Sequence, residues 1–272
     1  MNISTIGDDG SILLPSKAVT WFEFLAISRL TNSDYGGWNS KSYWLERGLN
    51  RLSTEIVYKW TENSLSEKAL PKPRKRDFKL ERAETAARLE AEQSGTKSLM
   101  DSGINDLTEN KLNAVLHTKD HWPCAWGSFL SYEVPLADES DGQLKIDLLG
   151  TGDKSLSIVE LKQAKSPSNT PLMALIEAIC YSIQIIRCKK NLPDKHQAFE
   201  RIRIIIAAPE AYWNQWNSKK HPEWSPKMWL PTLADIIAAV NQKLPGEVKL
   251  SLEMYSLHYE TKKITVKSIL SK

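Results

Sequence analysis

The stretch "KIDLLGTGDKSLSIVELKQ" (Lys145–Gln163) has the pattern of a β-hairpin, in which two apolar runs flank a turn rich in Gly, Thr, Asp and Ser. Charged residues interrupt these runs, with Asp147 in the first and Glu160 and Lys162 in the second. Side chains two positions apart in a strand point to the same face, so Glu160 and Lys162 share one face. Antiparallel pairing then puts Asp147 roughly opposite Ile158 or Glu160, and we expect the charged groups to converge.

Charged groups inside a sheet are costly to bury alone, and the cost falls when they pair with one another or hold a cation. Two carboxylates and a main-chain carbonyl form a set of hard oxygen ligands that suits Mg²⁺ or Mn²⁺. Such a cation polarises a phosphodiester oxygen and lowers the pKa of a bound water. A neighbouring lysine can orient that water and offset charge in the transition state. The alternative is that these residues form an exposed, charged edge of the sheet.

The segments around the hairpin predict alternating helices and strands. The run "IRIIIAAP" over residues 202–209 is almost entirely apolar, as is typical of a strand covered on both faces. This order of elements predicts an α/β fold with a mixed central β-sheet flanked by helices. We expect helices over residues 106–116, 170–190 and 233–244, and further strands over residues 130–136, 249–260 and 263–270.

The first hundred residues differ in pattern, and we expect domains over residues 1–100 and 101–272. Apolar residues at three- and four-residue steps over residues 41–60 predict an amphipathic helix, so this N-terminal region is expected to be mainly helical. A connector follows, and a polar helix over residues 83–95 is expected to end at Gly95. The basic residues of the connector are either phosphate contacts or a solvated linker: Lys72, Arg74, Lys75 and Arg76.

Composition narrows the class of protein. The net charge of +3 neither requires nor opposes a nucleic-acid partner. The three cysteines have no CxxC or zinc spacing, which indicates reduced thiols in a soluble, cytoplasmic protein without a membrane span. The five histidines are scattered, and the chain has neither a Gly-rich phosphate loop nor a GxSxG motif. Zinc chemistry, nucleotide hydrolysis and serine hydrolysis therefore lack support.

The segments "KIDLL" and "SIVELKQ" resemble the PD-(D/E)XK nuclease superfamily, which has the restriction-endonuclease-like fold. The resemblance covers about residues 101–210. It implies that Asp147 and Glu160 bind the metal, that the Leu161 carbonyl is a further ligand, and that Lys162 is catalytic.

Members of this family often carry an acidic residue on a helix before the hairpin. Glu109 in "TENKLNAVL" fits that role, and it lies on the same helical face as Leu112 and Leu116. The alternative is a capping box, in which Glu109 returns to the main chain of Asp106. Glu133 in "SYEVPL" is a rival for the acidic position.

Supporting residues are expected on both sides of the Glu-x-Lys triplet. Many family members carry a Q-x-x-x-Y stripe on the next helix, and Glu177 and Tyr181 occupy that spacing with Glu in place of Gln. Gln163 directly follows the triplet and is expected to support the scaffold or a phosphate.

Together these features predict a Mg²⁺- or Mn²⁺-dependent DNA nuclease, an endonuclease of restriction, phage defence or repair. RNA is a weaker alternative substrate. The competing hypothesis is a non-catalytic nucleic-acid-binding or assembly subunit with the same fold. The sequence leaves open whether the protein forms a homodimer or binds a partner protein subunit.

Overall fold

The computed structural model describes Phe78 and residues 86–118, 120–136, 145–164, 171–217, 226–244 and 247–270. The N-terminal region and the predicted basic contacts from Lys72 to Arg76 lie outside these residues. The chain divides into two compact units. One comprises Met1–Lys72, Pro167–Ile176 and Trp216–Gly246, and it contains helix α8 (Pro226–Lys243) and the start of α6 (Pro171–Arg187). The other comprises Pro73–Ser166, Glu177–Gln215 and Glu247–Lys272, and it holds the sheet.

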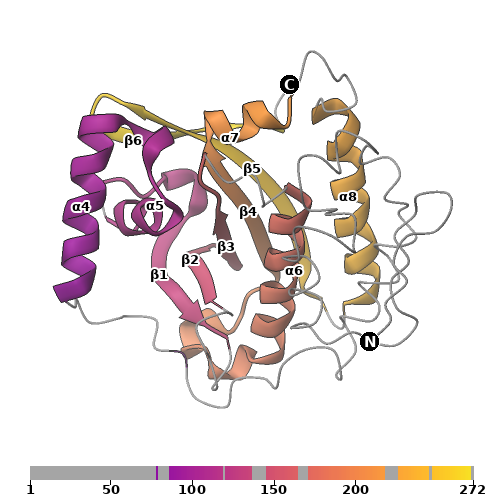
Figure 1. Cartoon of the computed structure of the whole chain (residues 1–272). Coiled ribbons are helices and arrows are strands. Elements are labelled where there is room, and N and C mark those ends of the chain that lie inside the picture. The colour runs from indigo at the N-terminus through magenta and orange to yellow at the C-terminus, as the bar shows by residue number, and fades with distance from the viewer. Residues whose placement is uncertain are drawn as a thin grey trace, which may run out of the picture. The chain divides into compact units, whose positions relative to one another are not determined.

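The second unit is built on a mixed six-stranded sheet with the strand order β1-β2-β3-β4-β5-β6 (Figure 1). The pairs β1–β2, β2–β3 and β5–β6 are antiparallel, whereas β3–β4 and β4–β5 are parallel. The strands are β1 (Ser128–Pro135), β2 (Lys145–Gly152), β3 (Ser155–Leu161), β4 (Arg201–Pro209), β5 (Lys249–Glu260) and β6 (Lys263–Ser268). The predicted α/β class with a mixed sheet and flanking helices is confirmed.

The predicted helices of the described region are all present, although α8 begins before residue 233. Besides α6 and α8 they are α4 (Ala86–Ser102), α5 (Glu109–Leu116) and α7 (Glu210–Gln215). Short 3₁₀ turns occupy Ile104–Asp106, Cys124–Trp126, Lys189–Asn191 and Asp194–His196. None of the helices in the described ranges combines the length and apolar character needed to cross a bilayer.

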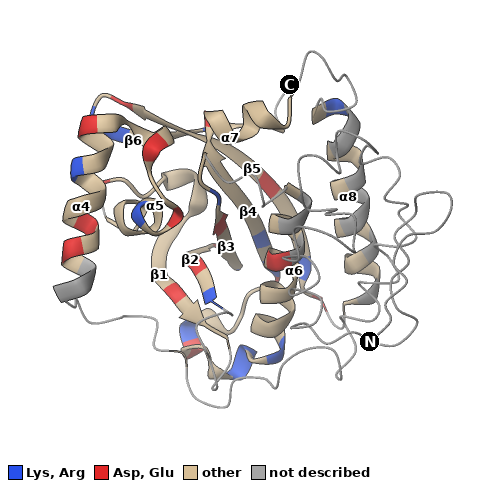
Figure 2. Cartoon of the chain, in the orientation of Figure 1, with Lys and Arg blue, Asp and Glu red and all other residues tan. Residues whose placement is uncertain are grey.

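The core on one face of the sheet lies under α4 and α5. Leu112 and Leu116 of α5 are fully buried there against Val159 and Leu161 of β3. Successive side chains in a strand alternate between faces, so Ile158 and Glu160 point to the opposite face. Figure 2 shows charged residues along α4. The charged residues of β4 are Arg201 and Arg203 at its start, and the rest of the strand, residues 204–209, carries no charge. The charges of the hairpin are therefore set in an otherwise apolar part of the sheet.

The prediction that the polar helix ends at Gly95 is wrong, because α4 continues to Ser102. Gly95 is buried where α4 meets α5. A Cβ atom at this position would lie 2.8 Å from Val115 Cγ2 and 3.1 Å from the Lys111 carbonyl oxygen. The glycine is therefore a contact residue between two helices, and packing outweighs its poor helix propensity.

Gly95→Ala is expected to lower the free energy of unfolding, although alanine improves helix propensity by about 1 kcal/mol. Overpacking of a buried contact costs about 1–3 kcal/mol, which exceeds that gain. Urea unfolding of Gly95→Ala, Val115→Ala and the double variant measures the coupling. Val115→Ala should reduce the cost of the new methyl group, and strictly additive effects would show that α4 and α5 do not meet closely at Gly95.

Candidate active site

The hairpin brings the three predicted charged residues to one place. Leu148 of β2 pairs with Val159 of β3, so the same register sets Asp147 opposite Glu160. The Asp147 carboxylate accepts a hydrogen bond of 2.8 Å from the Leu161 main-chain N–H. Lys162 directly follows β3, and its main-chain N–H donates to the Ala207 carbonyl at 3.0 Å, which extends the pairing with β4.

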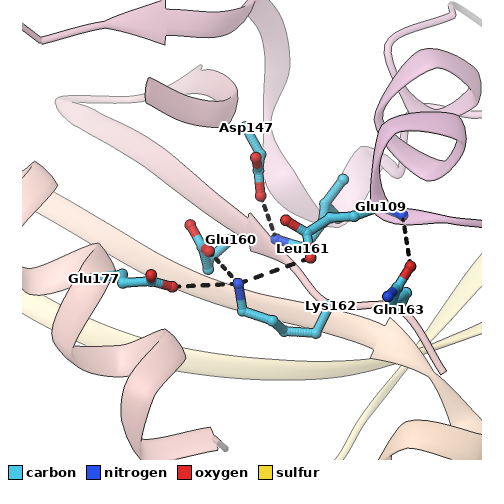
Figure 3. A network of polar contacts seen from close by, with 7 residues as sticks. All are labelled: Glu109, Asp147, Glu160, Leu161, Lys162, Gln163 and Glu177. Carbon is cyan, nitrogen blue, oxygen red and sulfur yellow. Dashed lines mark hydrogen bonds and ion pairs between the residues drawn. The ribbon is translucent and has the colours of Figure 1, made fainter. Parts of the chain in front are cut away.

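Lys162 is the centre of the site, and its side chain is almost completely buried, with 2% exposed. Its Nζ atom lies 2.5 Å from Glu160 Oε1, 3.3 Å from Glu177 Oε2 and 4.0 Å from Glu109 Oε2 (Figure 3). Glu109 comes from α5, Glu160 from β3 and Glu177 from α6. One ammonium group therefore forms ion pairs with carboxylates from α5, β3 and α6.

Glu109 takes part in this cluster instead of a capping box, so the capping interpretation is wrong. The N-cap of α5 is Thr108, whose side chain accepts a hydrogen bond from the Lys111 main-chain N–H. Asp106 ends a separate 3₁₀ turn and is separated from α5 by extended backbone at Leu107. The Glu109 main-chain N–H donates to Gln163 Oε1 at 3.3 Å, which joins α5 to the residue after the triplet.

Of the other predicted supporting residues, Tyr181 lies near the Lys162 cluster, whereas Glu133 pairs with Lys145. Tyr181 is buried one turn after Glu177, and burial, followed by the nearby Glu160, raises the pKa of its phenol well above the ordinary value. Glu133 has a left-handed backbone with a φ of 43°, and its Oε2 lies 3.8 Å from Lys145 Nζ. Both of these side chains are partly exposed.

The site has more negative charge than Lys162 can balance. Burial, followed by the neighbouring Glu109, raises the pKa of Asp147 to about 7, although Lys162 opposes the shift. Burial also raises the pKa of Glu160, against the effect of Lys162. Burial alone would lower the pKa of Lys162, but Glu160 and then Glu177 raise it well above its ordinary value. The lysine therefore stays charged, while the carboxyl groups compete for one ammonium.

Asp147→Asn is expected to stabilise the metal-free protein at pH 8. A carboxyl group with a raised pKa contributes stability that is complete below its ordinary pKa of 3.8 and is lost as the pH rises through about 7. Asparagine removes this loss, and its amide oxygen can still accept the hydrogen bond from Leu161. Thermal unfolding in EDTA should show the advantage of the variant shrinking steadily as the pH falls from about 7 to about 4. A difference that does not vary with pH would contradict the raised pKa.

The ligand types at the site fit a hard divalent cation. Asp147, Glu160 and the Leu161 carbonyl supply oxygen atoms, and the excess negative charge favours a second positive group. Within the described ranges, however, no group of three or more His, Cys, Asp or Glu side chains is arranged to hold a metal ion. In this arrangement the Lys162 ammonium engages Glu160 Oε1, so a cation would share Glu160 with the lysine.

Sequence reasoning missed two residues of the site. Asn113 Nδ2 donates to the Asp147 carbonyl oxygen at 3.2 Å, and its position four residues after Glu109 on α5 was a signal that could have found it. Tyr212 of α7 is fully buried. Burial raises the pKa of its phenol, and the positive charge of Lys162 has the largest opposing effect. No sequence pattern pointed to Tyr212.

The chain matches no known family model, no curated protein and no solved structure in comparisons with all three. What the site can do therefore follows from its own groups. It combines a buried ammonium, a half-buried carboxylate with a raised pKa and oxygen ligands of the kind that hard cations prefer.

Proposed function

We propose that this protein is a metal-dependent nuclease that hydrolyses DNA phosphodiester bonds at Asp147, Glu160 and Lys162. The observation that carries the proposal is the position of Lys162 Nζ, 2.5 Å from Glu160 Oε1. At the same end of β3, the Leu161 main-chain N–H donates a hydrogen bond to the Asp147 carboxylate. Metal-binding acids beside a buried ammonium are the groups that phosphodiester hydrolysis needs. The resemblance to the PD-(D/E)XK superfamily and its restriction-endonuclease-like fold supports the same assignment.

Each residue has a distinct part in this proposal. Asp147, Glu160 and the Leu161 carbonyl would hold Mg²⁺ or Mn²⁺, which polarises the phosphate and lowers the pKa of a bound water. The hydrogen bond from Leu161 N–H orients the Asp147 carboxylate. Lys162 stabilises the charge that builds on the phosphate oxygens, and it orients the attacking water. Glu177 and Glu109 help to hold the ammonium in position.

The proposed nuclease would bind DNA as its partner and act in the cytoplasm. DNA phosphates would contact the basic run from Lys72 to Arg76, whose structure lies outside the described residues. A cytoplasmic role in restriction, phage defence or repair is consistent with this chemistry. A second copy of the chain or a partner protein would supply any further DNA contacts.

A cleavage assay with four substrates tests the proposal. The protein is incubated with plasmid, linear duplex, single-stranded DNA and RNA, each with Mg²⁺, Mn²⁺, Ca²⁺ or EDTA. We expect DNA cleavage with Mg²⁺ or Mn²⁺, none in EDTA, and none with Asp147→Ala. Cleavage of RNA alone would replace DNA as the substrate. Tight DNA binding without cleavage under any metal would instead support the non-catalytic nucleic-acid-binding subunit.

A further inference from the structure

Helix α5 donates hydrogen bonds to both arms of the hairpin stretch, residues 145–163. The Glu109 main-chain N–H donates to Gln163 Oε1 at 3.3 Å, just after β3. Asn113 Nδ2 donates to the Asp147 carbonyl oxygen at 3.2 Å, within β2. Residues four apart lie on the same face of a helix, so Glu109 and Asn113 face the hairpin together. The Asn113 carboxamide is therefore placed beside the main chain of Asp147.

The other half of this carboxamide is an acceptor without a donor. Asn113 is 7% exposed, and its Oδ1 atom is buried and forms no hydrogen bond with any described residue. Exchanging the amide nitrogen and oxygen does not help, because Oδ1 would then face the Asp147 carbonyl oxygen, another acceptor. A buried polar atom left unsatisfied costs about 1–3 kcal/mol, so a group that persists there calls for a partner.

The groups on the same side of α5 supply no such partner by themselves. Glu109 lies one turn before Asn113 on α5, and the main chain of Asp147 accepts the Asn113 hydrogen bond. Both residues carry carboxylates, which accept hydrogen bonds and donate none when ionised. An amide oxygen that is buried without a donor can be satisfied by a positive ion. Amide and carboxylate oxygens are the ligand types of hard divalent cations.

We propose that Asn113 Oδ1 is a further ligand of the divalent cation held by Asp147, while its amide nitrogen fixes the Asp147 main chain. This inference rests on the proposed function only for the presence of the cation. It makes α5 a direct part of the metal site, with one neutral ligand added to the acids of the hairpin.

Two substitutions at Asn113 separate the roles of the amide oxygen and the amide nitrogen, and a third variant serves as the control. Asn113→Asp keeps an oxygen and removes the amide donor, whereas Asn113→Leu removes both at nearly constant volume. Asn110→Asp is the matched control, because it adds the same charge at an exposed position of the same helix. The affinity for Mn²⁺ is measured by calorimetry and by electron paramagnetic resonance on the full chain without nucleic acid. Thermal unfolding in EDTA monitors the fold.

We expect Asn113→Leu to weaken Mn²⁺ binding by about 10–100-fold, the scale seen when groups that support a metal site are removed. Asn113→Asp should bind Mn²⁺ at least as tightly as the wild type and more tightly than Asn110→Asp. The inference is overturned if Asn113→Asp binds as weakly as Asn113→Leu, or if Asn113→Leu binds as tightly as the wild type. Should Asn113→Leu fail to fold, weakened binding by Asn113→Asp alone overturns it.

The same measurements keep this inference apart from the proposed function. A wild type that binds Mn²⁺ with the expected order of variants but cleaves no nucleic acid ends the nuclease proposal and leaves the ligand assignment standing. If the wild type cleaves DNA and Asn113→Leu binds Mn²⁺ normally, the nuclease proposal stands and the ligand assignment is overturned. A wild type that binds no divalent cation overturns the ligand assignment.

Discussion

Lys162→Met is expected to destabilise the protein by about 3–5 kcal/mol, because removal of one partner leaves buried carboxylates without a compensating charge. The Nζ atom lies 2.5 Å from Glu160 and 3.3 Å from Glu177, and its side chain is almost fully buried. Methionine fills a similar volume, so loss of charge is the main change. We also expect DNA cleavage to fall by about 10²–10³-fold, the usual effect of removing one electrostatic stabiliser of a transition state.

Chemical unfolding and single-turnover cleavage measure the two effects. Lys154→Met is the matched control, since Lys154 also pairs with a glutamate, at 2.7 Å from Glu200, but in an exposed position. Exposed pairs contribute little, so this variant should unfold and cleave nearly as the wild type does. Adding Glu177→Gln to Lys162→Met should recover part of the stability without recovering cleavage. Recovery of cleavage by the double variant would show that Lys162 acts only through the fold.

Glu160→Gln is expected to abolish cleavage and metal binding while keeping the fold. The cation supplies several kcal/mol of transition-state stabilisation, so loss of its ligand should slow cleavage by about a thousandfold or more. Lys162 keeps Glu177 and Glu109 as partners, so no unpaired charge remains at the site. We therefore expect the free energy of unfolding in EDTA to change by only about 1 kcal/mol, the typical value of one hydrogen bond.

Glu253→Gln is the matched control for Glu160→Gln, because we expect it to lower stability and leave metal binding and cleavage unchanged. Arg203 donates to both oxygens of Glu253 at 2.6 and 2.7 Å, and Tyr255 donates a third hydrogen bond at 2.8 Å. Although burial opposes it, these hydrogen bonds lower the pKa of Glu253. The variant should lose stability but keep its affinity for Mn²⁺ and its cleavage rate. Loss of metal binding in Glu253→Gln as severe as in Glu160→Gln would show that the effect is not local to the hairpin.

The amino-acid pattern alone determined the hairpin and the charges within it. Alternation in a strand has a period of two residues, so the common face of Glu160 and Lys162 follows from their spacing. The apolar run of β4 and the periodic helices likewise depend on neighbours in the chain, which is why their class and order could be predicted. The assignment of Lys162 to catalysis came from the resemblance, and it stays a prediction.

Only the tertiary structure decided which helices complete the site. Periodicity tells which face of a helix is apolar, but it does not tell which strand that face will meet. Glu177 reaches Lys162 from α6, and Asn113 reaches Asp147 from α5, across sequence separations of 15 and 34 residues. Gly95 looked like the end of a helix because its local propensity is poor, yet contact with Val115 gives it a place inside α4. Long-range packing outweighs local preference at each of these positions, because burial and charge pairing are worth more than the propensity of one residue.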